Sequence, residues 1–461
     1  MRLRDHIKTV KGIRYLTEEL ELLSPAGRRC MLDLPMMTSA TEIEQSLNRL
    51  ELVLDCMKNK ELLKAISEIA LRLMQLRDVE GSVTAVYSGA MLTDIDLFEI
   101  KNLALISTSV AEIQTQLPHE LPLLPNLDET VKILDPEGKR IPTFMVYDSY
   151  SIELSELRKQ YRNIPEGDEK EALWIQISQV EDKVRRRLSR MLQPMGPALK
   201  EALDLLGYYD LLIAKAKLAL TQSYVRPRIN TEGRISYSNL RHPQVEAILK
   251  TRGQKFQPVS ITLSPGVALV TGANMAGKSV LLRSLAVAQL MSQYGFFLPA
   301  SDADIYPVKE VMLCIGDAQD ETEGLSSYGA EMVRLSEICH LVAGGESVLA
   351  LIDEPARTTN PTEGQAIVSG LVELLTAYSQ TIAVVTTHYS SVDVPCRRLR
   401  VKGFVEEKVK LPLHVNELNS CIDYSLEETD TSDVPHEAIR IAQILGVYPD
   451  LIDRSIKYIK R

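Results

Sequence analysis

The sequence has few cysteines and no long apolar run. Its six cysteines are scattered without a CxxC pair, and no basic flank followed by an uninterrupted apolar stretch stands at its start. These absences argue against a metal cluster and a secretory leader, so we expect a cytoplasmic protein with reduced thiols. The most apolar long stretch, residues 280–298, carries Arg283, Ser284, Gln289 and Gln293. It falls short of the roughly 20 apolar residues that cross a bilayer, and we expect no membrane span.

An excess of basic residues is also missing. The chain has a formal net charge of −10, and its acidic residues are spread through both halves. Nucleic-acid affinity comes largely from Lys and Arg side chains that neutralise phosphates, so this charge balance does not support DNA binding. The densest basic cluster, residues 183–190, reads Lys-Val-Arg-Arg-Arg-Leu-Ser-Arg. It could be a polyanion site, but we favour a solvated helix face paired with Glu181 and Asp182.

The first half of the chain carries helical periodicity. With 461 residues and 45% hydrophobic content, the chain is long enough for two or three globular domains. Ile43, Leu47, Leu50 and Leu54 recur at three- and four-residue steps, which predicts a helix with one buried face. A proline-rich stretch, about residues 118–146, interrupts the helical rhythm, which returns afterwards.

From about residue 226 the pattern changes. Short apolar runs, such as residues 267–270, 347–352 and 381–386, alternate with helical stretches. Strands that alternate with helices are joined by crossovers and pair in a mostly parallel sheet. We therefore predict an all-α domain over residues 1–225 and an α/β domain over residues 226–461.

A phosphate-binding motif opens the α/β domain. Residues 272–279 satisfy the pattern G-x4-G-K-[ST], with an apolar strand before them and an amphipathic helix after them. Glycines let backbone N–H groups and the helix N-terminus surround a phosphate chain. Lys278 supplies a positive charge for the β- and γ-phosphates of ATP, and the Ser279 hydroxyl can bind Mg²⁺. The predicted ATP-binding residues of this loop are Gly272, Ala273, Asn274, Met275, Ala276, Gly277, Lys278 and Ser279.

Two acidic residues follow a later candidate strand. Asp353 and Glu354 come directly after an apolar run. A carboxylate at the end of a neighbouring strand can hold Mg²⁺ opposite Ser279, and a second one can orient or deprotonate the attacking water. We predict that Asp353 and Ser279 are the metal ligands and that Glu354 is the catalytic base. His388 follows the next strand, where it could either sense the γ-phosphate or be structural.

A polar loop over residues 316–332 leads into a helix that we expect to begin near Ser326. A serine in this place commonly caps the helix. Together with the helix dipole, Ser326 could instead meet a phosphate. If that phosphate is bound by another subunit, the active site is shared across a dimer.

These motifs resemble those of the MutS family of DNA mismatch-repair ATPases, and the resemblance runs over nearly the whole chain. Residues 271–279 differ only slightly from the family's TGPNMGGKS, and residues 353–364 resemble the MutS2 version of the second motif. Thr387-His388-Tyr389 also falls where that family places it. Further segments that resemble the family are residues 23–29, 148–154, 224–227, 241–243 and 439–459.

The resemblance implies an ABC-ATPase-like P-loop domain preceded by core and lever helices, with the DNA clamp reduced to about residues 118–146. The family's mismatch-reading and connector domains have no counterpart here. The resemblance also implies ATP and Mg²⁺ at a site completed by dimerisation through the ATPase domain and the C-terminal helical segment, either with a second copy or with another chain. In that dimer Ser326 contacts the γ-phosphate bound by the opposite subunit, and His388 is a switch residue that acts in catalysis.

One residue departs from the family pattern. Pro355 directly follows the predicted base Glu354. Proline lacks an N–H and fixes a backbone dihedral where this loop must respond to nucleotide, so the hydrolysis rate is in question.

Two functions stay open at this stage. The first is an ATPase that remodels a protein complex, since short MutS-like proteins of similar layout include some thought to reactivate cobalamin-dependent aminomutases. The acidic charge and the missing DNA modules favour this hypothesis. The second is a DNA-binding MutS-like protein of mismatch repair or recombination control, which rests on the resemblance alone. A scaffold that binds nucleotide without turnover is a third alternative, which the full set of motif residues weakens.

Overall fold

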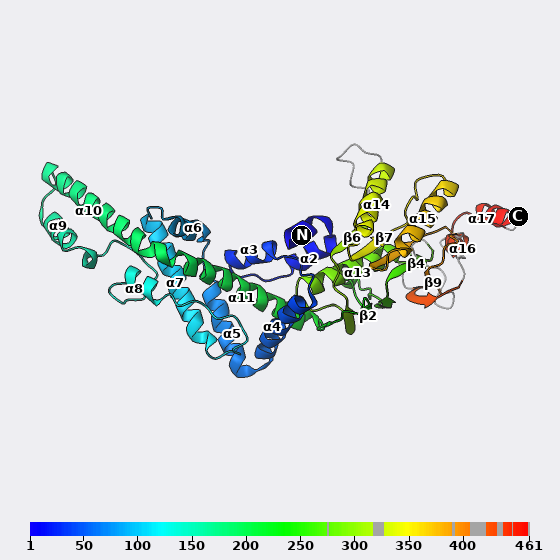
Figure 1. The fold of residues 1–461 in the computed structure, drawn as a ribbon, viewed down its shortest axis with the longest axis horizontal. Coiled ribbons are helices and arrows are strands. Elements are labelled where there is room, and N and C mark those ends of the chain that lie inside the picture. Colours follow the sequence, from blue (N-terminus) through cyan, green and yellow to red (C-terminus); the bar gives the residue numbers. More distant parts are fainter. Residues whose placement is uncertain are drawn as a thin grey trace.

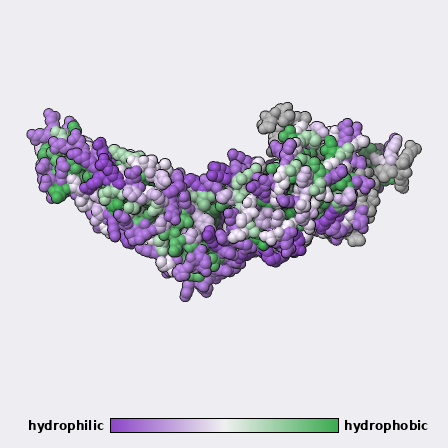
Figure 2. All heavy atoms as spheres, in the orientation of Figure 1, coloured by the Kyte–Doolittle hydropathy of each residue, from purple (hydrophilic) through white to green (hydrophobic). Residues whose placement is uncertain are grey.

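The computed structural model describes residues 1–273, 276–316, 327–389, 392–405, 421–430, 437–444 and 446–459. The molecule is elongated, with a helical half at one end and an α/β half at the other (Figure 1). Hydrophilic residues cover much of the visible face of the helical half (Figure 2). No helix within the described ranges combines the length and the apolar character that crossing a membrane requires.

The helical half confirms the periodicity of the sequence. The four apolar residues predicted to share a helix face, Ile43, Leu47, Leu50 and Leu54, are all buried on one helix. The helices of this half are α1 (Leu3–Thr9), α2 (Lys11–Glu18), α3 (Pro25–Asp33), α4 (Ala40–Lys58), α5 (Lys60–Leu73), α6 (Glu80–Ser88), α7 (Asp94–Gln114), α8 (Asp128–Leu134), α9 (Ile152–Asn163), α10 (Asp168–Leu192) and α11 (Gly196–Gln222).

The proline-rich stretch packs against α7 through a buried ion pair. Lys101 Nζ lies 3.0 Å from Asp135 Oδ1, and both side chains are only 1% exposed. Lys101 also donates to the Tyr147 hydroxyl at 3.0 Å. A buried charge is tolerated only when it is paired and hydrogen-bonded, so these contacts fix the irregular segment on the helix that precedes it.

The 27-residue helix α11 connects the two halves. Near its middle, the fully buried Asp210 accepts hydrogen bonds from the backbone N–H groups of Leu23 and Ser24 and from the Ser24 hydroxyl. One turn further on, Lys215 Nζ donates to the carbonyl oxygen of Tyr294 at 2.6 Å, directly after helix α13 (Lys278–Gln293). One rigid helix therefore contacts both the N-terminal segment and the end of the helix that follows the P-loop.

The α/β half contains the predicted parallel sheet. Its strand order is β10-β9-β4-β8-β7-β6, and all neighbours are parallel except β9 and β10. The strands are β4 (Gly266–Thr271), β6 (Glu310–Cys314), β7 (Val348–Ile352), β8 (Thr381–Thr386), β9 (Arg397–Phe404) and β10 (Ile422–Glu428). Alternate residues of the central strands pack toward α13 on one face and toward α14 (Ser327–Ala343) and α15 (Pro361–Thr376) on the other. Burial on both faces explains why these strands are continuous apolar runs.

A second sheet was not predicted. It has the order β1-β5-β2-β3 and is mixed, because β2 pairs antiparallel with both β3 and β5 whereas β1 and β5 are parallel. Its strands are β1 (Arg228–Ile229), β2 (Ile235–Leu240), β3 (Val259–Leu263) and β5 (Asp302–Ile305). The remaining helices are α12 (Pro243–Thr251), α16 (Glu437–Ile444) and α17 (Pro449–Ile459).

The first two helices pack on the α/β half. Leu3, Ile13 and Leu16 are buried in the same core as the apolar residues of α13. His6 Nδ1 lies 2.7 Å from the Tyr294 hydroxyl at the end of α13. The N-terminus therefore lies beside the helix that begins at the P-loop (Figure 1).

Candidate nucleotide site

The predicted phosphate-binding loop connects β4 to α13. Gly277, immediately before α13, has a φ of +76°, and a Cβ atom there would lie 2.8 Å from the ring of Tyr424. Only glycine combines that dihedral with such close packing, which explains this position of the motif. Gly272, Ala273, Ala276 and Gly277 are placed in the loop as expected, whereas Asn274 and Met275 lie outside the described residues.

Lys278 is held by the loop and by the predicted base. Its Nζ donates to the carbonyl oxygens of Gly272 at 2.6 Å and Ala273 at 3.2 Å. It also lies 3.1 Å from Glu354 Oε1. Burial by itself would raise the pKa of Glu354, but the charge and the hydrogen bond of Lys278, together with the nearby His388 and Arg357, lower that pKa below its usual value. Glu354 is therefore a carboxylate that is paired with Lys278, the lysine that we predict to bind phosphate.

The two predicted metal ligands are in contact. The Ser279 hydroxyl donates to Asp353 Oδ2 at 2.5 Å. The other carboxylate oxygen of Asp353 accepts a hydrogen bond from the Thr386 hydroxyl at 2.7 Å, and the Thr386 oxygen in turn accepts from the Glu354 backbone N–H at 2.9 Å. Because β7 and β8 are neighbours, the last residue of one strand orients the two acids that follow the other. Thr386 was not predicted from the sequence, in which its only signal is its place at the end of a strand.

Glu354 stands in an unusual turn. Its φ is +44° and that of Ala356 is +59°, on either side of Pro355. Residues other than glycine rarely adopt positive φ, and such residues cost about 1–3 kcal/mol each, so the surroundings must hold them in place. The Ala356 N–H donates to Glu331 Oε1 at 3.1 Å, and the Ala356 carbonyl accepts from the Tyr389 hydroxyl at 3.0 Å. Burial raises the pKa of Glu331.

Of the last two predicted residues, the structure describes His388 but not Ser326. The ring of His388 lies against that of Tyr389, with centroids 4.3 Å apart, and its buried Nδ1 has no hydrogen-bond partner among the residues that the structure describes. His388 is near enough to Glu354 to lower the pKa of that carboxyl, but no hydrogen bond joins the two side chains within the described part of the chain. Ser326 lies outside the described residues, and α14 begins at the next position.

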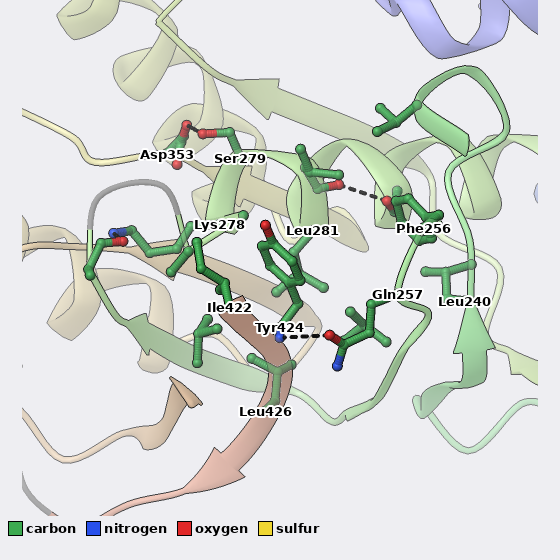
Figure 3. A pocket seen from close by; sticks show the side chains of 18 of the residues that line it. Leu240, Phe256, Gln257, Lys278, Ser279, Leu281, Asp353, Ile422, Tyr424 and Leu426 are labelled. Carbon is green, nitrogen blue, oxygen red and sulfur yellow. Dashed lines mark hydrogen bonds between the residues drawn. The ribbon is translucent and has the colours of Figure 1, made fainter. Parts of the chain in front are cut away.

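A pocket of about 1290 Å³ extends from this cluster (Figure 3). Lys278, Ser279 and Asp353 line one part of it, and apolar side chains line the other. The apolar residues labelled in the view are Leu240, Phe256, Leu281, Ile422 and Leu426, with the ring of Tyr424 between the two parts.

Gln257 fixes the floor of the apolar part. Its side-chain oxygen accepts from the Tyr424 backbone N–H at 3.3 Å, and its nitrogen donates to Asp423 Oδ1 at 2.7 Å. A pocket with a cationic, hydroxyl-bearing part and an apolar part suits a ligand with a phosphate chain and a flat base. Phe256 and Tyr424 lie outside the sequence motifs, so the sequence analysis did not identify them.

The P-loop lies between β4 and α13 and faces two acids that follow β7, which is separated from β4 by β8 and is not the directly neighbouring strand that the sequence led us to expect. This arrangement defines the C-terminal half as a P-loop nucleotide-binding domain. Residues 268–460 match the family model of MutS domain V, which is a P-loop ATPase domain. The fold and this match agree that the C-terminal half is a P-loop ATPase domain similar to domain V of MutS.

Curated relatives agree with this assignment. The chain is 28% identical to the endonuclease MutS2 of Carboxydothermus hydrogenoformans, over 65% of the chain and 37% of the relative. It is 30% identical to the DNA mismatch repair protein MutS of Rhodopseudomonas palustris, over 60% of the chain and 30% of that protein. A MutS of a Bradyrhizobium species is 32% identical over 58% of the chain and 29% of the relative. The chain is thus similar to part of each of these MutS and MutS2 proteins, and it spans about a third of their length.

Proposed function

We propose that the chain binds ATP with Mg²⁺ in this pocket and hydrolyses it. The contact between the Ser279 hydroxyl and Asp353 Oδ2 carries the proposal, because it brings a hydroxyl and a carboxylate together beside the phosphate-binding lysine. Hard oxygen ligands of this kind fit Mg²⁺, which keeps several water or phosphate ligands of its own. When bound, the ion would neutralise charge on the β- and γ-phosphates.

Four side chains of the protein would each have a role in hydrolysis. Lys278 would hold the β- and γ-phosphates, and the carboxylate of Glu354 would take the proton of the attacking water. As the water oxygen bonds to the γ-phosphorus, the bond to the bridging oxygen breaks and ADP leaves. His388 would respond to the γ-phosphate, and Ser326 of a second subunit would complete the site.

The proposed use of this cycle is to move the helical half against a protein complex. The length of α11 and its contact with the end of α13 support a mechanical connection between nucleotide and helices. The net charge of −10 supports a protein client over a nucleic acid. Reactivation of a cobalamin-dependent aminomutase is the particular form of this proposal.

The alternative is a DNA-binding protein of mismatch repair or recombination control. The names of the relatives, DNA mismatch repair protein MutS and endonuclease MutS2, favour it. Binding of the full chain to homoduplex, mismatched and branched DNA, measured across salt concentrations with and without ATP, separates the two. Tight binding that falls steeply with salt supports the DNA function.

Phosphate release from ATP tests the shared part of both functions. We expect Mg²⁺-dependent hydrolysis by the purified chain and its loss in Lys278→Ala. The same rate in that variant would overturn the assignment of the site.

A further inference from the structure

The helical half carries a basic surface that the nucleotide site does not use. Lys183, Arg186, Arg187 and Arg190 stand at positions i, i+3, i+4 and i+7 of α10 and are all exposed. This spacing places them on one face of the helix. We call these four residues the basic stripe.

The basic stripe has no acidic partner among the residues that the structure describes. Arg187 donates to the carbonyl oxygen of Tyr150 at 2.7 Å, a partner without a full charge, and forms no ion pair with a carboxylate in the described ranges. Within the described parts of the chain, no carboxylate forms an ion pair with Lys183, Arg186 or Arg190.

The neighbouring Arg185 is different. It lies 2.7 Å from Asp182 Oδ1, 3.1 Å from Asp94 Oδ1 and 3.9 Å from Glu181 Oε2. The pairing that we predicted for the whole cluster with Glu181 and Asp182 is thus found for Arg185 and is wrong for the stripe.

Intramolecular packing does not account for the stripe. Like charges three and four positions apart repel one another and weaken a helix. The buried residues of α10, which include Val180, Val184 and Leu188, lie on another face. Apart from the hydrogen bond of Arg187 to Tyr150, no hydrogen bond or ion pair of the described residues accounts for the four cations, and an anionic partner would remove the repulsion.

Three exposed apolar residues stand in a segment that contacts α10 at Arg185 and Ser189. Tyr87, Met91 and Ile95 are 64%, 50% and 69% exposed. Tyr87 lies near the end of α6, Met91 in the connection between α6 and α7, and Ile95 in the first turn of α7. This connection lies along the end of α10 (Figure 1). Within this connection, the backbone N–H of Leu92 donates to the Ser189 hydroxyl at 2.9 Å.

We propose that the basic stripe and these three apolar residues bind an acidic segment of a protein client that also carries apolar side chains. The carboxylates of that segment would pair with the stripe, and its apolar side chains would cover Tyr87, Met91 and Ile95. This surface deepens, and rests on, the proposed action on a protein complex.

The composition of the surface favours a protein over a nucleic acid. Tyrosine, methionine and arginine are enriched at protein interfaces. A phosphate backbone would satisfy the cations but leave the apolar side chains uncovered.

Fluorescence anisotropy with the full chain tests this surface with three labelled probes. The first is a peptide of alternating Glu and Leu residues, the second a Glu–Ser peptide of the same charge, and the third a DNA duplex. We expect the Glu–Leu peptide to bind at least about tenfold more tightly than either other probe. Met91→Ser with Ile95→Ser should bring its affinity down to that of the Glu–Ser peptide.

Charge reversal locates the site. Arg186→Glu with Arg190→Glu should abolish binding of the Glu–Leu peptide, and the milder Arg186→Gln with Arg190→Gln should weaken it if the first variant folds poorly. Lys60→Glu with Lys64→Glu is the matched control, because it makes the same charge change at the same spacing on the exposed face of α5.

Three outcomes overturn the surface: no binding of the Glu–Leu peptide, DNA binding of equal or greater affinity, or an equal loss in the α5 control. ATP hydrolysis measured on the same preparations separates this proposal from the proposed function. Intact hydrolysis without peptide binding overturns the surface alone. Peptide binding without any hydrolysis overturns the ATPase proposal alone.

Discussion

Lys278 Nζ and Glu354 Oε1 are 3.1 Å apart and form an ion pair in which the two side chains are 5% and 12% exposed. The cation that we assign to the phosphates is thus already neutralised by the carboxylate that we assign to the attacking water. A triphosphate that reaches Lys278 must compete with this carboxylate. Glu354 should therefore oppose ATP binding and promote ATP hydrolysis.

Glu354→Gln separates these two effects. Glutamine keeps the shape of the side chain but removes its charge, so we expect ATP to bind at least as tightly as in the unaltered chain. Hydrolysis should fall by about 10²–10⁴-fold, the usual contribution of a general base. Calorimetry with Mg²⁺ and ATP measures the first quantity, and phosphate release measures the second.

Glu373→Gln, on the exposed side of α15, is the control for Glu354→Gln and should change neither quantity. If Glu354→Gln released phosphate at the full rate, Glu354 would not be the base. If ATP bound much more weakly to this variant, the proposal that Glu354 competes with ATP for Lys278 would be wrong.

Thr386→Val tests the residue that orients both acids. Valine has nearly the same shape but gives up the hydrogen bonds of the Thr386 oxygen to Asp353 and from the Glu354 N–H. We expect about 1 kcal/mol lower stability, a higher Mg²⁺ concentration for half-maximal hydrolysis and about a tenfold lower rate. Urea unfolding and a Mg²⁺ titration of the rate measure these effects.

Thr386→Ser keeps the hydroxyl and should restore the Mg²⁺ dependence. An unchanged Mg²⁺ requirement in Thr386→Val would mean that Asp353 is positioned without Thr386.

The sequence predicted the parts of this site that follow from one segment or from the ends of strands in one parallel sheet. The residues of 272–279 follow one strand and begin one helix, so their spacing alone identifies the loop. Asp353 and Glu354 were predicted to face that loop because parallel strands carry their ends to one edge of a sheet. Thr386, Glu331 and Tyr389 could not be predicted, because each acts through a contact with another segment.

The same reason explains the sheet that was missed. The strand β1 has two residues and β5 has four, and both are too short to show alternation. Their pairing depends on long-range partners such as Arg228 with Asp304. The apolar runs of β4, β7 and β8 predicted the other sheet, since each is buried on both faces.

Phe256→Ala tests the apolar part of the pocket. Removing an aromatic ring that would contact a nucleobase should weaken ATP binding by about tenfold, since stacking on a base contributes about 1–3 kcal/mol. Binding of inorganic triphosphate with Mg²⁺ should be unchanged, because it uses Lys278 and the P-loop alone. Calorimetry with both ligands makes the comparison.

An equal loss for ATP and triphosphate in Phe256→Ala would show a general disturbance of the pocket. Unchanged ATP binding would place the base elsewhere.

Two buried histidines should make stability depend on pH. Burial lowers the pKa of His6 to about 4, and the positive charge of the N-terminus adds to the effect. Burial also lowers the pKa of His242 to about 4, with a further contribution from Arg283. The neutral rings are used in the fold, because His242 Nδ1 accepts from the Val245 N–H and His6 Nδ1 lies 2.7 Å from the Tyr294 hydroxyl.

The sign of this dependence follows from proton binding. Between pH 6.5, the ordinary pKa of histidine, and about pH 4, the unfolded chain binds protons at these two positions and the folded chain does not. The free energy of unfolding should therefore be highest above pH 6.5. It should fall by about 2–3 kcal/mol for each histidine as the pH drops toward 4. Urea unfolding at about pH 8 and about pH 5 measures the loss.

His6→Gln with His242→Asn tests this assignment, because it keeps a side-chain acceptor at both positions and asparagine is a good helix cap at residue 242. This variant should lose much less stability over the same pH range. The exposed His119→Gln is the control and should behave as the unaltered chain, whereas an equal acid loss in the double variant would assign the dependence to carboxylates instead.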